Sequence, residues 1–272
     1  MKYNKFVRFI MFISLLCFFL LAYGFAKGAY TVLNPQKGKL IASNNTQKKK
    51  DDDNVHKSDQ LKIVALGDSL TRGVGDDEGT GYVGRLKNNL QKEYKQSTSI
   101  SNLAVSGAKT SDLLHDLKKK NIQETLSTAN IVVLSIGSND LFPGANQMNE
   151  QFLKTYRPDE KTFQNNLSSI FKIIHQQNPN ASIYTFGYYN PFHNVQGLDA
   201  SSSFVYRWNN LLELATLQVK NAYVIPTFDL FYNEEDQYLY TDHFHPNKDG
   251  YIEMANRLTS KIGSQLRGES NE

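Results

Sequence analysis

Residues 61–70 read Leu-Lys-Ile-Val-Ala-Leu-Gly-Asp-Ser-Leu, a short apolar run that stops at glycine, aspartate and serine. A short run of this kind, with β-branched residues and a turn signal behind it, is typical of a strand buried on both faces of a sheet. Four similar runs follow along the chain, at Ile100–Val105, Ile131–Ile136, Ile183–Phe186 and Ala222–Ile225. We therefore expect five strands, the first of them at Ile63–Leu66.

Helical patterns lie between these apolar runs. Tyr82, Leu86 and Leu90 recur at helical spacing soon after the first run. The same spacing links two further sets, Phe163, Leu167, Ile170 and Ile174, and then Ile252, Ala255, Leu258, Ile262 and Leu266. Strands that alternate with helices predict an α/β fold in which helices cover both faces of a parallel sheet. Residues 61–267 suit one such domain.

The N-terminal segment has the composition of a membrane anchor or a signal peptide. Three basic residues precede an apolar run from Phe9 to Ala26, namely Lys2, Lys5 and Arg8. As a helix this run would extend about 27 Å, close to the thickness of the bilayer core. We assign residues 1–27 to this element and favour an uncleaved single-pass anchor. Ala26-Lys27-Gly28 offers a weak cleavage site that would release a secreted protein. In both cases the basic flank predicts that the rest of the chain lies outside the cytoplasm.

The stretch between this segment and the first strand is polar and aperiodic. We interpret residues 28–60 as a flexible linker and residues 268–272 as a disordered tail. The formal net charge of +3 is too small to suggest a nucleic-acid partner, and the basic Lys48–Lys50 is followed at once by the acidic Asp51–Asp53. The single cysteine, Cys17, excludes an intramolecular disulfide.

Chemically capable side chains follow four of the expected strands or their helices. Ligands of open parallel sheets bind at the carboxyl ends of the strands, so these segments should meet at one edge. They are Gly67-Asp68-Ser69, Ser106-Gly107, Gly137-Ser138-Asn139-Asp140 and Asp242-His243-Phe244-His245. Together they supply a hydroxyl, a glycine backbone, a carboxamide, an imidazole and a carboxylate.

With these four segments in this order, the chain resembles the SGNH, or GDSL-like, lipase/acylhydrolase family. The resemblance covers essentially all of residues 61–267. It implies a flavodoxin-like three-layer α/β/α sandwich with a five-stranded parallel sheet. It also implies that Ser69 is the nucleophile, His245 the base and Asp242 the carboxylate that orients the base. Gly107 and Asn139 would join the Ser69 backbone N–H in an oxyanion hole.

These residue types suit acyl transfer on physical grounds. A serine hydroxyl becomes a good nucleophile only when a base such as His245 takes its proton. Asp242, three residues earlier, is well placed to fix the tautomer of that base. Donors fixed around the developing oxyanion then stabilise the transition state, and Asn139 offers such a donor. We interpret Asp140 as structural support for the loop that holds Asn139.

Other features of the sequence have weaker functional interpretations. The glycine-rich stretch at residues 73–79 misses the dinucleotide-binding spacing by one residue and is acidic. The chain contains no G-x-S-x-G motif, which separates it from the ordinary α/β-hydrolases. Four aromatic residues are expected at the rim of the site: Tyr188, Tyr189, His193 and His243.

The leading hypothesis is an extracytoplasmic serine ester hydrolase without a metal or cofactor. Its substrate would be a lipid ester, such as a lysophospholipid, or an acyl ester on a cell-envelope glycan. An acyl-CoA thioesterase is disfavoured, because the expected topology keeps the site away from cytoplasmic CoA. Two alternatives remain. One is a membrane-tethered, non-catalytic lipid- or glycan-binding module, and the other is a metal-dependent hydrolase using Asp242, His243 and His245.

Overall fold

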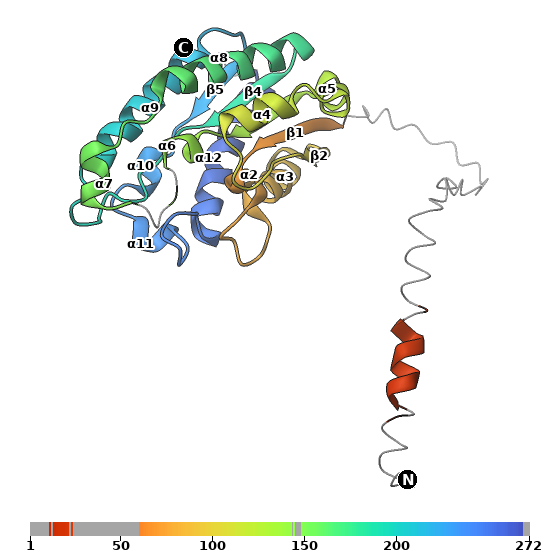
Figure 1. Ribbon diagram of the computed structural model, residues 1–272. Helices are drawn as coiled ribbons and strands as arrows, with labels where there is room; N and C mark the ends of the chain where they lie inside the picture. Colours follow the sequence, from red (N-terminus) through yellow and green to blue (C-terminus); the bar gives the residue numbers. More distant parts are fainter. Residues whose placement is uncertain are drawn as a thin grey trace, which may run out of the picture. The chain divides into compact units, whose positions relative to one another are not determined.

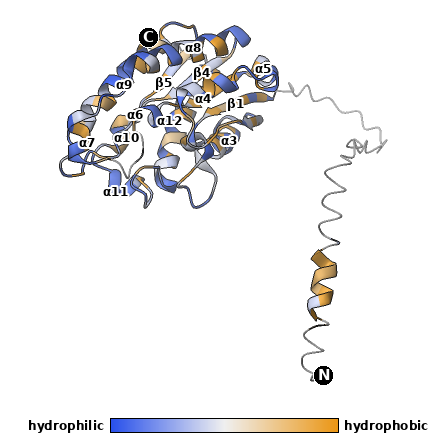
Figure 2. Cartoon of the chain, viewed as in Figure 1, coloured by the Kyte–Doolittle hydropathy of each residue, from blue (hydrophilic) through white to orange (hydrophobic). Residues whose placement is uncertain are grey.

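The computed structural model describes residues 11, 13–21, 23, 60–142, 144 and 148–268. The chain divides into two units, Met1–Val55 and His56–Glu272. In the first unit, the described residues between 11 and 23 are helical, exposed and mostly hydrophobic (Figure 2). No helix in the described part of the chain is both long and apolar enough to cross a membrane. Most of the expected anchor at residues 1–27 lies outside the described residues. So do the linker at residues 28–60, apart from Gln60, and the tail beyond Gly268.

The second unit is built on a five-stranded sheet in the order β2-β1-β3-β4-β5, with every neighbouring pair parallel (Figure 1). The strands are β1 (Leu61–Gly67), β2 (Thr98–Asn102), β3 (Ile131–Ser135), β4 (Ser182–Phe186) and β5 (Ala222–Ile225). This order is that of a flavodoxin-like sheet, whose ligand crevice lies where the strand order reverses. Here the reversal is at β1 and β3, whose last residues Gly67 and Ser135 are aligned.

The helices pack on both faces of the sheet (Figure 1). On one face, Val64 and Leu66 of β1 join a core with α4 (Thr110–Asp116), α5 (Lys120–Ser127), α8 (Glu160–Gln177) and α9 (Ser201–Thr216). On the other face, Ile63 and Ala65 pack with α3 (Gly81–Tyr94) and α12 (Lys248–Leu266). Alternate residues of one strand therefore belong to two cores, which confirms the predicted three-layer sandwich.

Within the described residues, five helices of no more than six residues occupy the connections. They are α2 (Ser69–Arg72), α6 (Ser138–Leu141), α7 (Glu150–Thr155), α10 (Phe228–Phe231) and α11 (Glu235–Tyr238). Two of them, α2 and α6, begin within three residues of the ends of β1 and β3. Their first turns therefore lie at the carboxyl edge of the sheet, where the candidate residues Ser69 and Asn139 are found.

Two elements differ from the sequence expectation. The second strand was expected at Ile100–Val105, but β2 spans Thr98–Asn102. This strand lies at the edge of the sheet, pairs only with β1 and is partly exposed, so polar residues are tolerated in it. The apolar run at residues 100–105 therefore does not coincide with the strand. Helix α9, which carries the fully buried Trp208, was not anticipated, because three serines begin it and polar residues interrupt its pattern.

Candidate active site

Ser69 is placed by the tight turn that ends β1. Gly67 has a φ of +129°, and a Cβ there would lie 1.9 Å from the carbonyl oxygen of Ser135. Only glycine therefore allows the two strand ends to approach this closely. The next residue, Asp68, caps α2 by accepting a hydrogen bond from the Leu70 N–H at 3.1 Å. Ser69 thus becomes the first residue of a helix that starts at the edge of the sheet.

A buried polar network lies beneath this turn. The Asp68 carboxylate accepts a hydrogen bond from Ser135 Oγ at 2.8 Å. Thr71 Oγ1 is 2.6 Å from Ser135 Oγ and 2.6 Å from the Tyr82 hydroxyl. Burial raises the pKa of Asp68 to about 7, against the opposing effect of the Ser135 hydrogen bond. No pattern in the sequence indicates this network, because its members come from the N-terminal end of α2, from α3 and from β3.

His245 joins Ser69 to Asp242. Its Nε2 lies 2.8 Å from Ser69 Oγ, and its Nδ1 lies 2.7 Å from Asp242 Oδ2. Asp242 Oδ1 accepts the backbone N–H groups of Phe244 at 3.0 Å and His245 at 2.9 Å, which closes the turn. Partial burial acts to raise the pKa of Asp242, but the hydrogen bonds from His245 and Phe244 outweigh it and lower the pKa below its usual value. A carboxylate that stays ionised is the acceptor that a histidine base requires.

The loop that carries His245 is held by contacts from two other segments. Tyr189, after β4, donates its hydroxyl to the Phe244 carbonyl at 2.7 Å. Gly75, after α2, has a φ of +93°, and a Cβ there would lie 2.5 Å from the Pro246 carbonyl oxygen and 3.0 Å from His245 Cβ. The glycine-rich stretch at residues 73–79 therefore packs against the loop of the base through Gly75.

The same acidic stretch is fixed by an ion pair. Asp76 is buried and accepts hydrogen bonds from the backbone N–H groups of Glu78 at 3.1 Å and Gly81 at 2.7 Å. It also pairs with Arg85, which in turn bonds Glu78 at 3.0 Å. These bonds anchor the segment that contains Gly75 to α3.

Gly107 and Asn139 meet at the carboxyl ends of β2 and β3. Asn139 Nδ2 donates to the Ala108 carbonyl at 3.0 Å, which ties the two loops together. Next to it, the Asp140 carboxylate accepts from the Thr110 N–H at 2.9 Å and from the Thr110 hydroxyl at 2.5 Å. Asp140 therefore joins α6 to the start of α4, in agreement with the structural role expected for it.

A cavity of about 900 Å³ opens in front of these groups. Its lining comprises all five residues expected in the catalytic triad and oxyanion hole, together with eight others. The residues are Ser69, Val74, Ser106, Gly107, Lys109, Asn139, Phe142, Gly144, Thr241, Asp242, His243, Phe244 and His245. His243, which the sequence placed at the rim, lies in this lining and has a φ of +51°.

The other three expected rim residues do not line this cavity. Tyr188 is 5% exposed and donates its hydroxyl to the Ile136 carbonyl at 2.7 Å. Tyr189 is buried and bonds the loop of the base, as described above. The His193 ring packs against the Tyr232 ring in a tilted arrangement, with ring centroids 4.1 Å apart. Tyr188 and Tyr189 follow a strand end, as the sequence indicated, but hydrogen bonds to carbonyl groups hold them beneath the site.

Sequence reasoning missed Val74, Lys109 and Phe142 in the lining. Each follows an expected site residue closely: Lys109 lies two positions after Gly107, and Phe142 three positions after Asn139. Proximity to a strand end was therefore the available signal. The candidate ligands of the metal alternative are arranged differently from a metal centre, since Asp242 bonds His245 and His245 in turn bonds Ser69. In the described residues, no three His, Cys, Asp or Glu side chains gather around one point as metal ligands.

This geometry can be compared with known proteins. Residues 65–251, more than half of the chain, match the model of the GDSL-like Lipase/Acylhydrolase family. The chain belongs to this family. As a GDSL-like hydrolase it is a carboxylic ester hydrolase of the esterase/lipase type.

Two relatives and one solved structure illustrate the similarity. This GDSL-like hydrolase is 32% identical over 209 residues to the uncharacterized protein YpmR of Bacillus subtilis, with 75% of this chain and 82% of YpmR covered. It is 29% identical over 214 residues to the spore germination lipase LipC of Bacillus licheniformis, with 76% and 99% covered. The crystal structure of the lipase Lip_vut3 from a goat rumen metagenome superposes with a TM-score of 0.63 at 25% identity, with 74% of this chain and 97% of that chain covered.

Proposed function

We propose that this GDSL-like hydrolase is a serine esterase that works outside the cytoplasmic membrane, on acyl esters of lipids or of cell-envelope glycans. The observation that carries the proposal is the continuous chain of contacts from Ser69 through His245 to Asp242, at 2.8 and 2.7 Å, along the wall of one cavity. A hydroxyl, an imidazole and an ionised carboxylate in this order are the parts of a nucleophilic triad.

Each atom of the triad has a defined task in the proposed reaction. Ser69 Oγ attacks the ester carbonyl while His245 Nε2 takes its proton. Asp242 Oδ2 accepts the hydrogen bond from Nδ1–H, which keeps Nε2 unprotonated before the attack and stabilises the imidazolium after it. His245 then returns the proton to the departing alcohol. Water hydrolyses the resulting acyl-serine by the same route, and the reaction uses no metal or cofactor.

Three donors are available for the oxyanion. The backbone N–H groups of Ser69 and Gly107 donate to no acceptor in the described part of the chain. Asn139 has two N–H donors on Nδ2, and the bond to Ala108 orients the group. A Cβ at Gly107 would meet nothing within 4 Å, so the space beside this backbone is open. Each oxyanion donor is worth about 3 kcal/mol in comparable sites.

The proposed location rests on the N-terminal sequence. The basic residues followed by an apolar run favour a single-pass anchor with the hydrolase domain on the outer side. Cleavage of the anchor would instead give a secreted enzyme. The exposed, apolar side chains of the helical residues 13–21 are consistent with contact with lipid. Protease treatment of intact cells tests this topology, since a cytoplasmic domain would remain protected.

Covalent labelling tests the catalytic proposal. The full chain, purified in detergent, should react with a fluorophosphonate probe and hydrolyse p-nitrophenyl butyrate. The Ser69→Ala variant should lose both the label and the hydrolysis. Ser106→Ala is the matched control, because Ser106 lines the same cavity and should not be the labelled residue. Full labelling of Ser69→Ala would refute the assignment. A wild-type chain that is neither labelled nor active would instead support the non-catalytic binding module.

A further inference from the structure

The segment at residues 74–76 contacts both halves of the proposed triad. The Val74 N–H donates to the Ser69 carbonyl at 3.0 Å, in the turn that carries the nucleophile. The next residue, Gly75, packs against the loop of the base, since a Cβ at this position would lie 3.0 Å from His245 Cβ. The segment therefore connects the nucleophile to the base by a second route, independent of the hydrogen bond between Ser69 Oγ and His245 Nε2.

A buried ion pair holds this segment in place. Arg85 of α3 pairs with Asp76, and the two side chains are 10% and 0% exposed. The guanidinium also donates to the Gly81 carbonyl at 3.1 Å and to Glu78 Oε2 at 3.0 Å. Burial acts to raise the pKa of Asp76, but the hydrogen bonds from Arg85 and from backbone N–H groups outweigh it and lower the pKa. Because the planar guanidinium bonds several acceptors at once, it fixes the position of Asp76 as well as its charge.

Two further contacts come from α12, which begins three residues after the base. Tyr251 donates its hydroxyl to the Val74 carbonyl at 2.8 Å. Lys248 pairs with Glu78 at 2.7 Å, but both side chains are half exposed, and an exposed pair of this kind contributes little to stability. In the part of the chain that the structure describes, the pair that holds Asp76 is the most deeply buried ion pair.

We propose that Arg85 is a positioning residue, which keeps the base within reach of the nucleophile through the segment at residues 74–76. This role rests on the proposed function and adds to it a side chain outside the cavity lining. Without the guanidinium, the Asp76 carboxylate loses its buried counter-ion, and the segment has to shift until the carboxylate meets water. The shift withdraws the support that Gly75 gives to His245, so the 2.8 Å contact between Nε2 and Ser69 Oγ lengthens. A small misplacement of reacting groups slows the chemical step steeply.

Arg85→Met tests this role on the full chain, purified in detergent, with p-nitrophenyl butyrate as the substrate. The end point of fluorophosphonate labelling counts the active sites, so that kcat refers to folded molecules alone. We expect kcat per labelled site to fall roughly tenfold or more, while KM changes by less than about twofold, because the cavity lining is kept and only the alignment of the triad is lost. A residue that merely stabilises the fold would lower the number of labelled sites and leave kcat per labelled site at the wild-type value.

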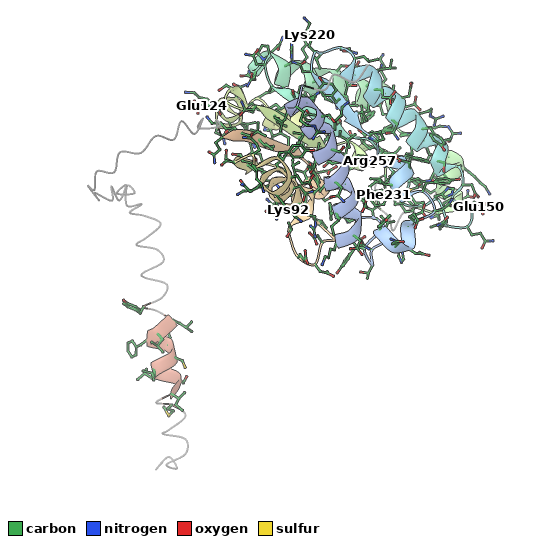
Figure 3. The ribbon with its side chains drawn as sticks, turned by 180° about the vertical axis from the view of Figure 1, so that it is seen from behind. Lys92, Glu124, Glu150, Lys220, Phe231 and Arg257 are labelled. Atoms are coloured by element: carbon green, nitrogen blue, oxygen red, sulfur yellow. The ribbon has the colours of Figure 1, made fainter. Side chains whose placement is uncertain are left out.

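Arg257→Met is the matched control. Arg257 lies on α12 and outside the cavity lining, and it likewise joins a helix to a neighbouring loop (Figure 3). It bonds Asp229 at 2.6 Å and the Pro226 carbonyl at 2.9 Å. This variant loses an arginine–aspartate pair of the same kind and should keep the wild-type kcat per labelled site. An equal fall in kcat in Arg257→Met would overturn the inference, because the effect would then follow from the loss of any such pair.

Two other variants complete the test. Arg85→Lys keeps a positive charge beside Asp76 and should have a higher kcat per labelled site than Arg85→Met, and equal values would contradict the role of the charge. Asp76→Asn keeps an acceptor for the backbone N–H groups but loses the charge pair, so it should lower kcat per labelled site even where Arg85→Met does not fold. Wild-type kcat per labelled site in Arg85→Met, or in Asp76→Asn where the first variant does not fold, overturns the inference and leaves the proposed function standing. A wild-type chain that is neither labelled nor active overturns both.

Discussion

Replacing Asp68 by asparagine should make the stability of the protein less dependent on pH. Asp68 is fully buried; its Oδ1 accepts from Leu70 and Ser135, and its Oδ2 has no hydrogen-bond partner in the described part of the chain. Burial raises the pKa of this carboxyl to about 7, against 3.8 for an unperturbed aspartate. Asparagine keeps an oxygen for the two donors and removes the group that must ionise.

The size and sign of the effect follow from this difference in pKa. Between about pH 4 and pH 7 the folded protein keeps the Asp68 proton, while the unfolded chain has released it. Folding therefore takes up a proton, and this group lowers the free energy of unfolding as the pH rises through that window. At 1.36 kcal/mol per pH unit, the loss amounts to about 4 kcal/mol above pH 7. As the pH rises from about 4 to about 7, the free energy of unfolding of Asp68→Asn relative to wild type should increase by that amount, and above pH 7 it should stay constant.

Urea unfolding between about pH 4.5 and about pH 8.5 measures this difference. Trp208 is the single tryptophan of the chain and is fully buried, so its fluorescence reports unfolding directly. Asp229→Asn is the matched control, because the hydrogen bond from Arg257 lowers the pKa of Asp229 and the substitution should instead destabilise the protein at neutral pH. A stability difference between Asp68→Asn and wild type that does not change across this range would refute the reasoning.

Three further substitutions test the parts of the site separately. Gly75→Ala forces a Cβ against the Pro246 carbonyl at a φ of +93° and should displace the His245 base. The kcat for p-nitrophenyl butyrate should therefore fall at least roughly tenfold. An unchanged kcat would contradict the close packing. Asp242→Asn keeps an acceptor for the turn but presents an amide to the His245 ring. We expect kcat to fall about a thousandfold or more with little change in melting temperature. Tyr189→Phe removes the hydrogen bond to the Phe244 carbonyl and should lower the free energy of unfolding by about 1 kcal/mol in urea titrations. An unchanged free energy of unfolding would show that this bond does not stabilise the fold.

The fold could be predicted largely because its central strands are buried on both faces. Such strands read as continuous apolar runs, and the central strands β1, β3 and β4 lie within two residues of the expected positions. The edge strand β5 lies at its expected position because its four residues are apolar or aromatic. The exceptions have the opposite character. The edge strand β2 begins with the polar residues Thr98 and Ser99, and α9 begins with three serines. Local composition describes an element poorly where tertiary packing, such as that around Trp208, holds it in place.

The candidate site was predictable where its residues directly follow strand ends. The sequence placed Ser69, Gly107 and Asn139 at one edge, and the structure brings them together with the expected base and carboxylate. Its support was not predictable, because the partners of Asp68, including Ser135, are separated by up to 67 residues and meet only in the folded chain. The direction of a side chain could not be predicted from the sequence either, and the tyrosines Tyr188 and Tyr189, expected at the rim, are buried beneath the site.

The length of β1 has a practical consequence for how the domain can be attached to other objects. This strand runs from Leu61 to Gly67, and at ~3.3 Å per residue it separates the point where the chain enters the domain from the nucleophile by about 20 Å. A fluorescent protein or an affinity tag fused ahead of Leu61 joins the sheet at the end opposite to Ser69. The domain can therefore be immobilised on a bead or an electrode through its N-terminal end while the entrance for the ester stays open to solution.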